Sequence, residues 1–214
     1  MNEHDFRSMR RNYGKSELVE TQISPNPFDQ FSHWFKEAKA SGILEPNAMS
    51  LATASKSGHP RNRIVLLKEI NATGLVFFTN YLSQKGQDLE ENPYASALFF
   101  WDKEERQVRF DGKVEKISRE ESEAYFLSRP FESQIGAHAS IQSSTIPNRE
   151  FVESKYEDMK EKYSGQIVPI PDYWGGYILI PEVIEFWQGR SSRLHDRIEY
   201  KKSNNQWTIN RLSP

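Results

Sequence analysis

The sequence predicts an α+β domain, mainly β, built on an antiparallel sheet that curls into a barrel. Three observations predict this class. The chain has 214 residues, enough for one domain that buries its own core. Short β-rich runs recur at about ten-residue spacing, separated by Gly, Pro and Asn. Helical patterns flank and interrupt these runs.

Composition excludes several classes of protein. Aromatic residues make up 13% of the chain, which favours a packed core over disorder. The 28 basic and 30 acidic side chains nearly balance, so we expect neither a nucleic-acid partner nor a membrane partner. The absence of cysteine excludes disulfides, thiolate metal sites and cysteine nucleophiles. The longest apolar run, residues 97–101, is far shorter than a membrane-spanning helix, and no signal-peptide pattern opens the sequence. We therefore expect a cytoplasmic protein.

We expect a mobile N-terminal arm over residues 1–25 and a single domain over residues 26–214. The arm has no hydrophobic periodicity, which is typical of a frayed terminus or of a basic flap that closes on an anion. Its basic residues are Arg7, Arg10, Arg11 and Lys15. The first helix should follow at once, because Asn26 is a good N-cap, Pro27 suits the first helical position and Gly42 ends the pattern.

Apolar runs bounded by turn residues predict the strands. The last two strands are separated by Asn204-Asn205, a pair that favours a hairpin turn. The expected strands cover residues 49–54, 61–69, 75–79, 95–101, 106–117, 175–180, 183–188, 193–201 and 207–212.

Three further helices are expected to interrupt the sheet. A short one covers residues 83–91. The second begins with a capping box of Ser118 and Glu121 and ends before Pro130. The third is capped by Asn148.

Common catalytic motifs are missing from the sequence. The five histidines form no HExxH pair, and neither a Gly-rich phosphate loop nor a GxSxG nucleophile elbow occurs. We therefore expect no metal site, no hydrolase triad and no dinucleotide-binding unit.

Cations next to strands and turns are the first candidate site residues. Arg63 and Lys68 bracket an apolar strand, and a separation of five places them on opposite faces of a regular strand. Lys85 lies in the first turn of a helix, where free N–H groups attract an anion. Each cation by itself is typical of a solvated surface charge, so the prediction rests on their combination.

A phenol, a guanidinium and a hydroxyl occur within nine residues, at Tyr125, Arg129 and Ser133. Together these groups can bind a phosphate. The bland interpretation of each is again a solvated surface group.

Residues 185–197 are the densest candidate segment. Trp187 is followed by Arg193, His195 and Arg197, which alternate and would share one face of a strand. Burying such charges without a counter-anion is costly, so we interpret this face as the wall of a pocket for an anionic, aromatic ligand. A surface stripe paired with Asp and Glu is the alternative.

Nine short motifs connect these residues to a known family. The motifs are R-I-V-L-L-K (63–68), F-F-T-N (77–80), E-R-Q-V (105–108), Y-F-L-S-R-P (125–130), S-Q-I-G-A (133–137), Q-S-S (142–144), W-G-G (174–176), I-E-F-W-Q-G (184–189) and R-L-H-D-R (193–197). In this order, over nearly the whole chain, they resemble the pyridoxine (pyridoxamine) 5′-phosphate oxidases, FMN enzymes that make pyridoxal 5′-phosphate. The last two motifs together are the most specific.

The resemblance implies a homodimer of a split β-barrel with FMN in a cleft between protomers. It implies that Arg63 and Lys85 bind the FMN phosphate, with Ser143 nearby. Gln84 departs from the family, which usually has Arg there, and the loss of one charged hydrogen bond would weaken FMN binding about ten- to hundredfold. The other implied FMN contacts are Ile64, Val65, Leu66, Leu67, Lys68, Phe78, Thr79, Gln107, Gln142, Trp187 and Arg197.

For the substrate, the resemblance implies a phosphate clasp and a covering arm. Arg193 and His195 are the expected catalytic residues, which would steer the reacting group in a two-electron oxidation that releases hydrogen peroxide. The alternatives are a flavin reductase of the same superfamily and a non-catalytic protein that binds pyridoxal phosphate or flavin. The implied substrate-binding residues are Arg10, Arg11, Asn12, Tyr13, Lys68, Tyr125, Arg129, Ser133, Arg193, Leu194 and His195.

Overall fold

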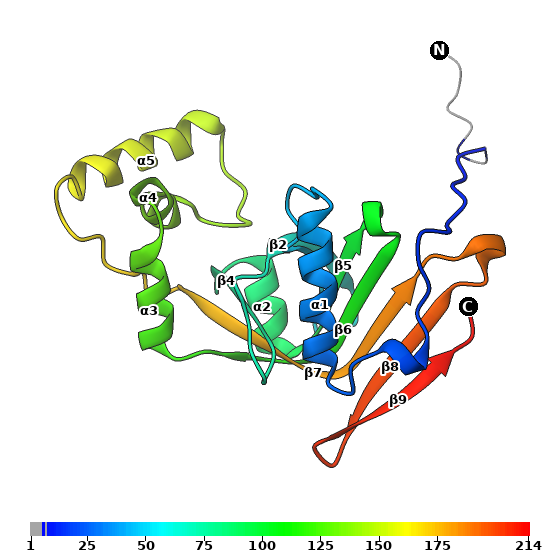
Figure 1. The fold of residues 1–214 in the computed structure, drawn as a ribbon. Coiled ribbons are helices and arrows are strands. Elements are labelled where there is room, and N and C mark those ends of the chain that lie inside the picture. The colour runs from blue at the N-terminus through cyan, green and yellow to red at the C-terminus, as the bar shows by residue number, and fades with distance from the viewer. Residues whose placement is uncertain (1–5, 7) are drawn as a thin grey trace. The chain divides into compact units, whose positions relative to one another are not determined.

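The computed structural model describes residue 6 and residues 8–214 (Figure 1). The predicted contribution of Arg7 to a basic arm, and residues 1–5 of that arm, lie outside the described residues. Over the described chain, the structure contains five α-helices and nine strands. The predicted α+β class, with mainly β structure, is confirmed.

The helices and strands follow the order expected for this class. The helices are α1 (Pro27–Ala40), α2 (Gln84–Glu91), α3 (Arg119–Ser128), α4 (Phe131–Ala139) and α5 (Arg149–Lys162). The strands are β1 (Ala48–Ala54), β2 (Pro60–Leu66), β3 (Glu69–Ile70), β4 (Leu75–Asn80), β5 (Tyr94–Trp101), β6 (Arg106–Lys116), β7 (Trp174–Gln188), β8 (Asp196–Ser203) and β9 (Gln206–Leu212). The hydrogen-bonded strand order is β2-β1-β5-β6-β7-β4-β3, with β8 paired to β7 and β9 paired to β8.

The chain divides into two compact units. Unit 1 comprises residues 1–46, 98–110 and 182–214, and unit 2 comprises residues 47–97 and 111–181. Three strands, β5, β6 and β7, contribute residues to both units.

Unit 1 packs α1 onto an aromatic core. The side chain of Asn26 accepts the N–H of Phe28 at 3.0 Å and Pro27 opens the helix, as predicted. Phe31 and Trp34 are almost fully buried. Burying one such side chain contributes about 1.5–3 kcal/mol, so this aromatic face, more than helix propensity, stabilises α1.

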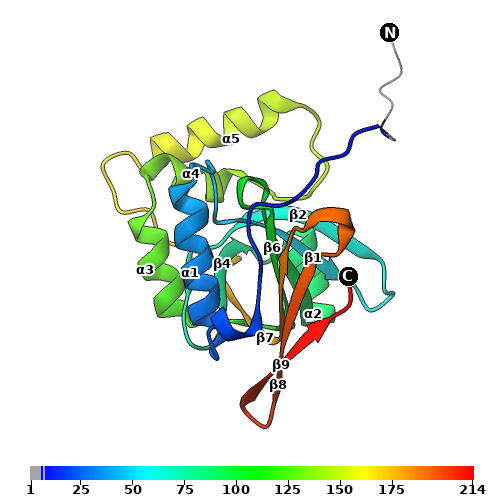
Figure 2. The ribbon, with the colours of Figure 1, turned by 45° about the vertical axis from the view of Figure 1, so that its right-hand side comes forward.

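The hairpin of β8 and β9 also belongs to unit 1 (Figure 2). Asn204 and Asn205 form its turn, with φ values of 49° and 61°. A two-residue hairpin turn of this kind requires the left-handed region twice, and Asn tolerates that region better than most residues. The register pairs Ser203 with Gln206 across the turn, so the predicted hairpin is confirmed.

Unit 2 contains the remaining helices. The hydroxyl of Ser118 accepts the N–H of Glu121, and the carboxylate of Glu121 accepts the N–H of Ser118, which confirms the predicted capping box of α3. Asn148 caps α5 as predicted. Pro130 lies after the end of α3, as predicted, and is the N-cap of α4, which begins at Phe131 and not at Ser133, where the next helix was expected. Figure 1 shows α4 beside α5.

The prediction of two separate strands over residues 175–180 and 183–188 is wrong. They form one strand, β7, which continues across Pro181. β4 pairs with residues 174–179 of this strand and β8 pairs with residues 183–188. Pro181, which has no N–H, therefore lies where neither of these partners needs a hydrogen bond from it.

Candidate functional site

A cavity of about 680 Å³ in unit 2 is lined by twelve of the predicted ligand-binding residues. This volume lies in the range of about 300–1,000 Å³ that is typical of small-molecule sites. The predicted residues that line it are Arg63, Ile64, Val65, Leu66, Lys68, Phe78, Thr79, Lys85, Tyr125, Arg129, Ser133 and Gln142.

Lys85 is the most buried cation of this cavity. Ser83 caps α2, so Lys85 lies in the first helical turn. Its ammonium donates to Oγ1 of Thr79 (3.0 Å), Oγ of Ser83 (3.2 Å) and Oε1 of Gln142 (2.8 Å). Burial lowers the pKa of Lys85 to about 8, and the charge of Arg63 adds to this shift. Because these acceptors are neutral, an anionic ligand would supply the charge that the ammonium needs.

Arg63 is positioned by residues that the sequence did not reveal. Its Nη1 donates to Oγ1 of Thr53 at 2.7 Å, and that hydroxyl donates to Asp88 at 2.8 Å. Asp88 is 1% exposed, and its carboxylate lies 3.8 Å from Nη2 of Arg63. Burial lowers the pKa of Arg63, and the charge of Asp88 partly offsets that shift. An acid three residues after Lys85, on the buried face of a short helix, is the signal that could have identified it.

Three of the predicted FMN contacts that belong to unit 2 do not line this cavity. Gln84 donates to Asp88 at 3.1 Å, and Arg61 binds the same carboxylate oxygen at 2.8 Å. Leu67 is buried away from the cavity. Ser143 is exposed, with a φ of 69°.

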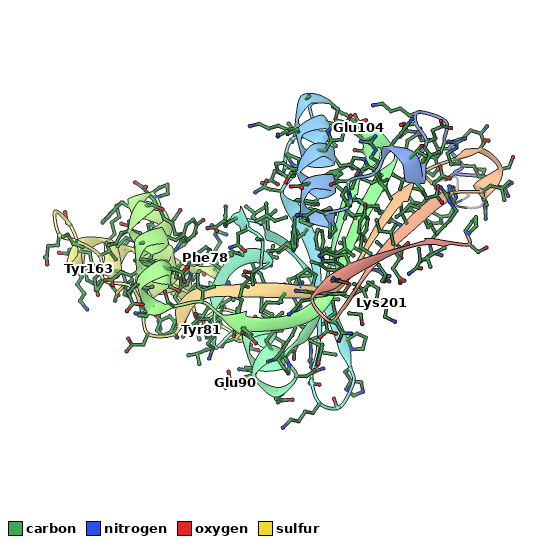
Figure 3. The ribbon with its side chains drawn as sticks, turned by 60° about the horizontal axis from the view of Figure 1, so that its bottom comes forward. Phe78, Tyr81, Glu90, Glu104, Tyr163 and Lys201 are labelled. Carbon is green, nitrogen blue, oxygen red and sulfur yellow. The ribbon has the colours of Figure 1, made fainter. Side chains whose placement is uncertain are left out.

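An aromatic stack lies against the other cations. The ring of Phe78, labelled in Figure 3, stacks on Tyr125 at 3.8 Å and on Trp174 at 5.5 Å. The guanidinium of Arg129 lies 4.7 Å from the centre of the Trp174 ring. Its Nη1 is buried and has no hydrogen-bond partner among the described residues. Burial lowers the pKa of Arg129, which Tyr125 partly offsets. A half-buried guanidinium with one buried, unsatisfied donor is suited to bind an anion.

Trp174 is a lining residue that the sequence interpretation did not assign. Its signal was the W-G-G motif, which carried the resemblance but no predicted role.

The expectation that Arg63 and Lys68 point to opposite faces is wrong. The strand predicted over residues 61–69 ends at Leu66, and the N–H of Lys68 donates to the carbonyl of Val76 at 2.9 Å. Because the chain leaves β2 between the two cations, strand alternation does not apply to them. Both line the same cavity.

In unit 1, a cavity of about 340 Å³ is lined by Gln107, Trp187 and Arg197. Arg197 is bidentate on Glu185, with distances of 2.8 and 3.2 Å. This hydrogen bonding raises the pKa of Arg197. The charge of Arg197 is therefore balanced by Glu185 and not only by a bound ligand. Arg197 fits the alternative interpretation, in which the cations of this segment pair with Asp and Glu.

A second cavity of unit 1, of about 580 Å³, is lined by arm residues 10–13, Arg193 and His195. The prediction that Arg193, His195 and Arg197 share one strand face is wrong. β8 begins only at Asp196, and Arg193 has a left-handed φ of 62° in a short 3-10 turn. The Gly-Arg-Ser-Ser sequence before Arg193 favours a turn, which removes the strand alternation on which the prediction depended.

His195 is oriented by the main chain of this turn. Its Nδ1 accepts the N–H of Arg190 at 3.0 Å, so Nε2 is the ring nitrogen left for a ligand. Leu194, predicted to bind substrate, is 69% exposed and does not line the cavity.

Two further searches concern the described residues only. Over residues 6 and 8–214, no helix is long and apolar enough to cross a membrane. In the same part of the chain, no group of three or more His, Asp or Glu side chains could hold a metal ion.

Residues 35–163 match the family described as pyridoxamine 5′-phosphate oxidase. Residues 174–214 match the pyridoxine 5′-phosphate oxidase C-terminal dimerisation region. A protein of Gloeothece citriformis named pyridoxine/pyridoxamine 5′-phosphate oxidase is 52% identical, over 96% of this chain and 97% of its own. A protein of Paraburkholderia phymatum with the same name is 53% identical over the same shares.

Solved structures agree with these matches. PhzG from Burkholderia lata, in complex with tetrahydrophenazine-1-carboxylic acid, has a TM-score of 0.88 and 27% identity, and covers 94% of this chain and 100% of its own. A pyridoxamine 5′-phosphate oxidase-related, FMN binding protein from Nostoc punctiforme has a TM-score of 0.72 at 15% identity, covering 93% and 100%, and supports the fold. The predicted split-barrel class is thereby confirmed, and the chain belongs to the pyridoxamine 5′-phosphate oxidase family.

Proposed function

We propose that this protein is an FMN-dependent oxidase that converts pyridoxine 5′-phosphate or pyridoxamine 5′-phosphate to pyridoxal 5′-phosphate. The unit 2 cavity carries this proposal, because it combines two pairs of cations, Arg63 with Lys85 and Lys68 with Arg129, with an aromatic stack. A flavin phosphate and a substrate phosphate each require cationic partners, and their rings require apolar contact. The names of the relatives support the same reaction.

The donor set of the cavity fits FMN. The ammonium of Lys85 is hydrogen-bonded to neutral oxygens, and Arg63 is close enough to shift its pKa, so two cations converge where a phosphate would bind. We assign the FMN phosphate to these two residues, with Phe78 and Thr79 beside the rings. FMN bound there would accept the two electrons of the oxidation and pass them to oxygen.

We assign the substrate phosphate to Arg129, with Tyr125, Ser133 and Lys68. The Nη1 of Arg129 is the strongest support, since a phosphate oxygen would satisfy a buried donor that is otherwise unsatisfied among the described residues. The contact with Trp174 fixes the guanidinium before a ligand arrives, which reduces the entropy lost on binding.

The overall reaction removes two hydrogens from the substrate carbon and its attached group. With the alcohol substrate, these two hydrogens and one O2 yield one hydrogen peroxide. With the amine, one water is also consumed and one ammonia is released. Arg193 and His195 are the proposed catalytic residues: Arg193 would steer the reacting group, and Nε2 of His195 would donate its N–H to that group, since Nδ1 accepts the N–H of Arg190.

The proposal includes a homodimer. It is supported by the match of residues 174–214 to a region described as a dimerisation region. In a homodimer with two-fold symmetry, the same surface of each protomer forms the interface.

Peroxide release tests the proposed function. FMN-loaded protein should release peroxide with pyridoxine 5′-phosphate and far less with unphosphorylated pyridoxine at equal concentration. Arg129→Ala should raise KM for the phosphate ester about tenfold or more, since a charged hydrogen bond contributes about 1.5–3 kcal/mol. Lys160→Ala, on the exposed face of α5, is the matched control and should behave as wild type.

Two results would contradict the proposal. A protein that binds FMN and vitamer without peroxide would be a non-catalytic carrier. Peroxide release at equal rates with both alcohols would indicate a different flavin enzyme of the superfamily.

A further inference from the structure

Glu105 is a buried acid to which the proposed reaction gives no role. It follows the 3-10 turn Asp102–Glu104 between β5 and β6, next to Glu104, which Figure 3 labels. Its φ of 54° and ψ of 38° lie in the left-handed region, and it is 5% exposed. A left-handed backbone is uncommon for Glu, and a buried carboxylate needs partners. Glu105 therefore needs hydrogen-bond donors or cations close to its carboxylate.

The carboxylate of Glu105 binds the N-terminal arm. Its Oε2 accepts the N–H groups of Gly14 (2.8 Å) and Lys15 (3.0 Å), and its Oε1 lies 3.4 Å from Nη2 of Arg11. Burial would raise the pKa of Glu105, but the hydrogen bonds from Lys15 and Gly14 and the charges of Arg11 and Lys15 together lower it. Two consecutive main-chain donors on one oxygen fix the backbone of the arm, and not merely a flexible side chain.

The carbonyl of the same residue binds the end of β7. It accepts the N–H of Gly189 at 2.7 Å and Nε2 of Gln188 at 3.2 Å. These two residues directly follow Trp187. Glu105 therefore connects the arm, through its side chain, to the segment that carries Trp187, through its main chain.

Tyr13 lies where these two segments meet. Its ring contacts the ring of Trp187 edge-on at 5.7 Å and the ring of His195 at 5.8 Å. A Cβ at Gly189 would lie 2.7 Å from Cγ of Tyr13, so glycine leaves room for this ring. Tyr13 and His195 line the same cavity, together with Arg10. The position of the arm therefore determines which side chains surround His195.

From these contacts we infer that Glu105 is a positioning residue: it holds arm residues 11–15 in place so that Tyr13 stands beside Trp187 and His195, and it thereby sets the affinity for the substrate. The part of this inference that concerns substrate rests on the proposed function. The part that concerns the arm does not.

Glu105→Gln in the FMN-loaded, full-length protein is the direct test. It keeps the size of the side chain and removes the charge that binds two N–H groups and Arg11. Trypsin should cleave after Arg10, Arg11 and Lys15 about tenfold faster than in wild type, measured by mass spectrometry. KM for pyridoxine 5′-phosphate should rise about tenfold while kcat stays within about twofold and FMN affinity is unchanged.

Three other variants complete the experiment. Glu104→Gln removes the ion pair with the Lys15 ammonium (2.7 Å) but no main-chain contact, so its effect should be smaller. Gly189→Ala leaves Glu105 intact and displaces Tyr13, so it should also raise KM. It tests whether the position of Tyr13 sets the substrate affinity, even where Glu105→Gln does not fold. Glu115→Gln, on an exposed ion pair with Lys113, should match wild type.

The outcomes separate the two proposals. Unchanged trypsin cleavage and unchanged KM in Glu105→Gln would overturn the proposed role of Glu105. A rise in the Kd for FMN as large as the rise in KM would overturn it as well. If the wild-type protein releases no peroxide, the proposed function is overturned. If the Glu105→Gln variant of the same protein is still cleaved faster by trypsin in the arm, the contact between Glu105 and the arm is supported independently.

Discussion

Lys85 shows at the scale of one residue how folding prepares a cation for an anion. Its pKa of about 8 lies below the ordinary value of 10.5, because the folded chain removes the ammonium from water. The unfolded chain binds more protons between these two values, so the free energy of unfolding of the apoprotein rises with pH over that window. Below about pH 8, burying the charge opposes folding in full.

The same shift predicts a pH dependence of FMN binding. A phosphate needs the charged ammonium, so the Kd for FMN should rise about tenfold between pH 7 and pH 9 as Lys85 loses its proton. Quenching of FMN fluorescence on titration into apoprotein measures this constant. Lys85→Met should bind more weakly at pH 7 and show no such change with pH. The same change of the FMN Kd with pH in wild type and in Lys85→Met would show that a group other than Lys85 causes it.

Most of the side chains that line the unit 2 cavity could be predicted from the sequence, but those that position them could not. Arg63 and Arg129 lie in recognisable motifs, and Lys85 lies in the first turn of a predicted helix. Asp88 and Glu105 reach their cations and N–H donors from distant parts of the chain, and only the folded topology brings them together. The motif that contains Glu105 and the position of Asp88 after Lys85 mark both residues in the sequence, but the groups that each one contacts follow only from the fold.

At the scale of elements, signals with a local mechanism predicted structure well. The cap of α1, the capping box of α3 and the Asn-Asn hairpin are each decided within a few residues. The prediction of two strands in place of β7 failed, because continuity across Pro181 depends on which strands lie alongside. The prediction of a strand from residue 193 failed because it did not use the turn signal of residues 189–192. A local pattern cannot report its neighbour in the sheet.

Helix α3 gives a prediction at this scale. Ser118→Ala should lower the free energy of unfolding by about 1 kcal/mol, because the N–H of Glu121 loses its acceptor. Urea unfolding followed by circular dichroism measures the change. Ser118→Asp restores an acceptor at the N-cap and should recover most of the loss. An equal decrease in the free energy of unfolding in both variants would show that the decrease does not come from the lost N-cap acceptor.

At the scale of the whole molecule, the proposed homodimer has a measurable consequence. Light scattering at micromolar concentration should give twice the mass of one chain, because the region of residues 174–214 matches a dimerisation region. Holoprotein and apoprotein should be measured together, so that a dimer formed only with FMN is distinguished from one present throughout. The mass of a single chain at every concentration would contradict the proposed assembly.

The buried Nη1 of Arg129 has a consequence for laboratory evolution. An unsatisfied buried donor costs about 1–3 kcal/mol for as long as the cavity holds no anion, so this side chain makes the empty protein less stable. Selection of the isolated protein for heat resistance alone, with no phosphate ester present and no requirement for activity, should therefore replace Arg129 with an apolar residue. The survivors would tolerate higher temperature and would no longer discriminate esters from free alcohols.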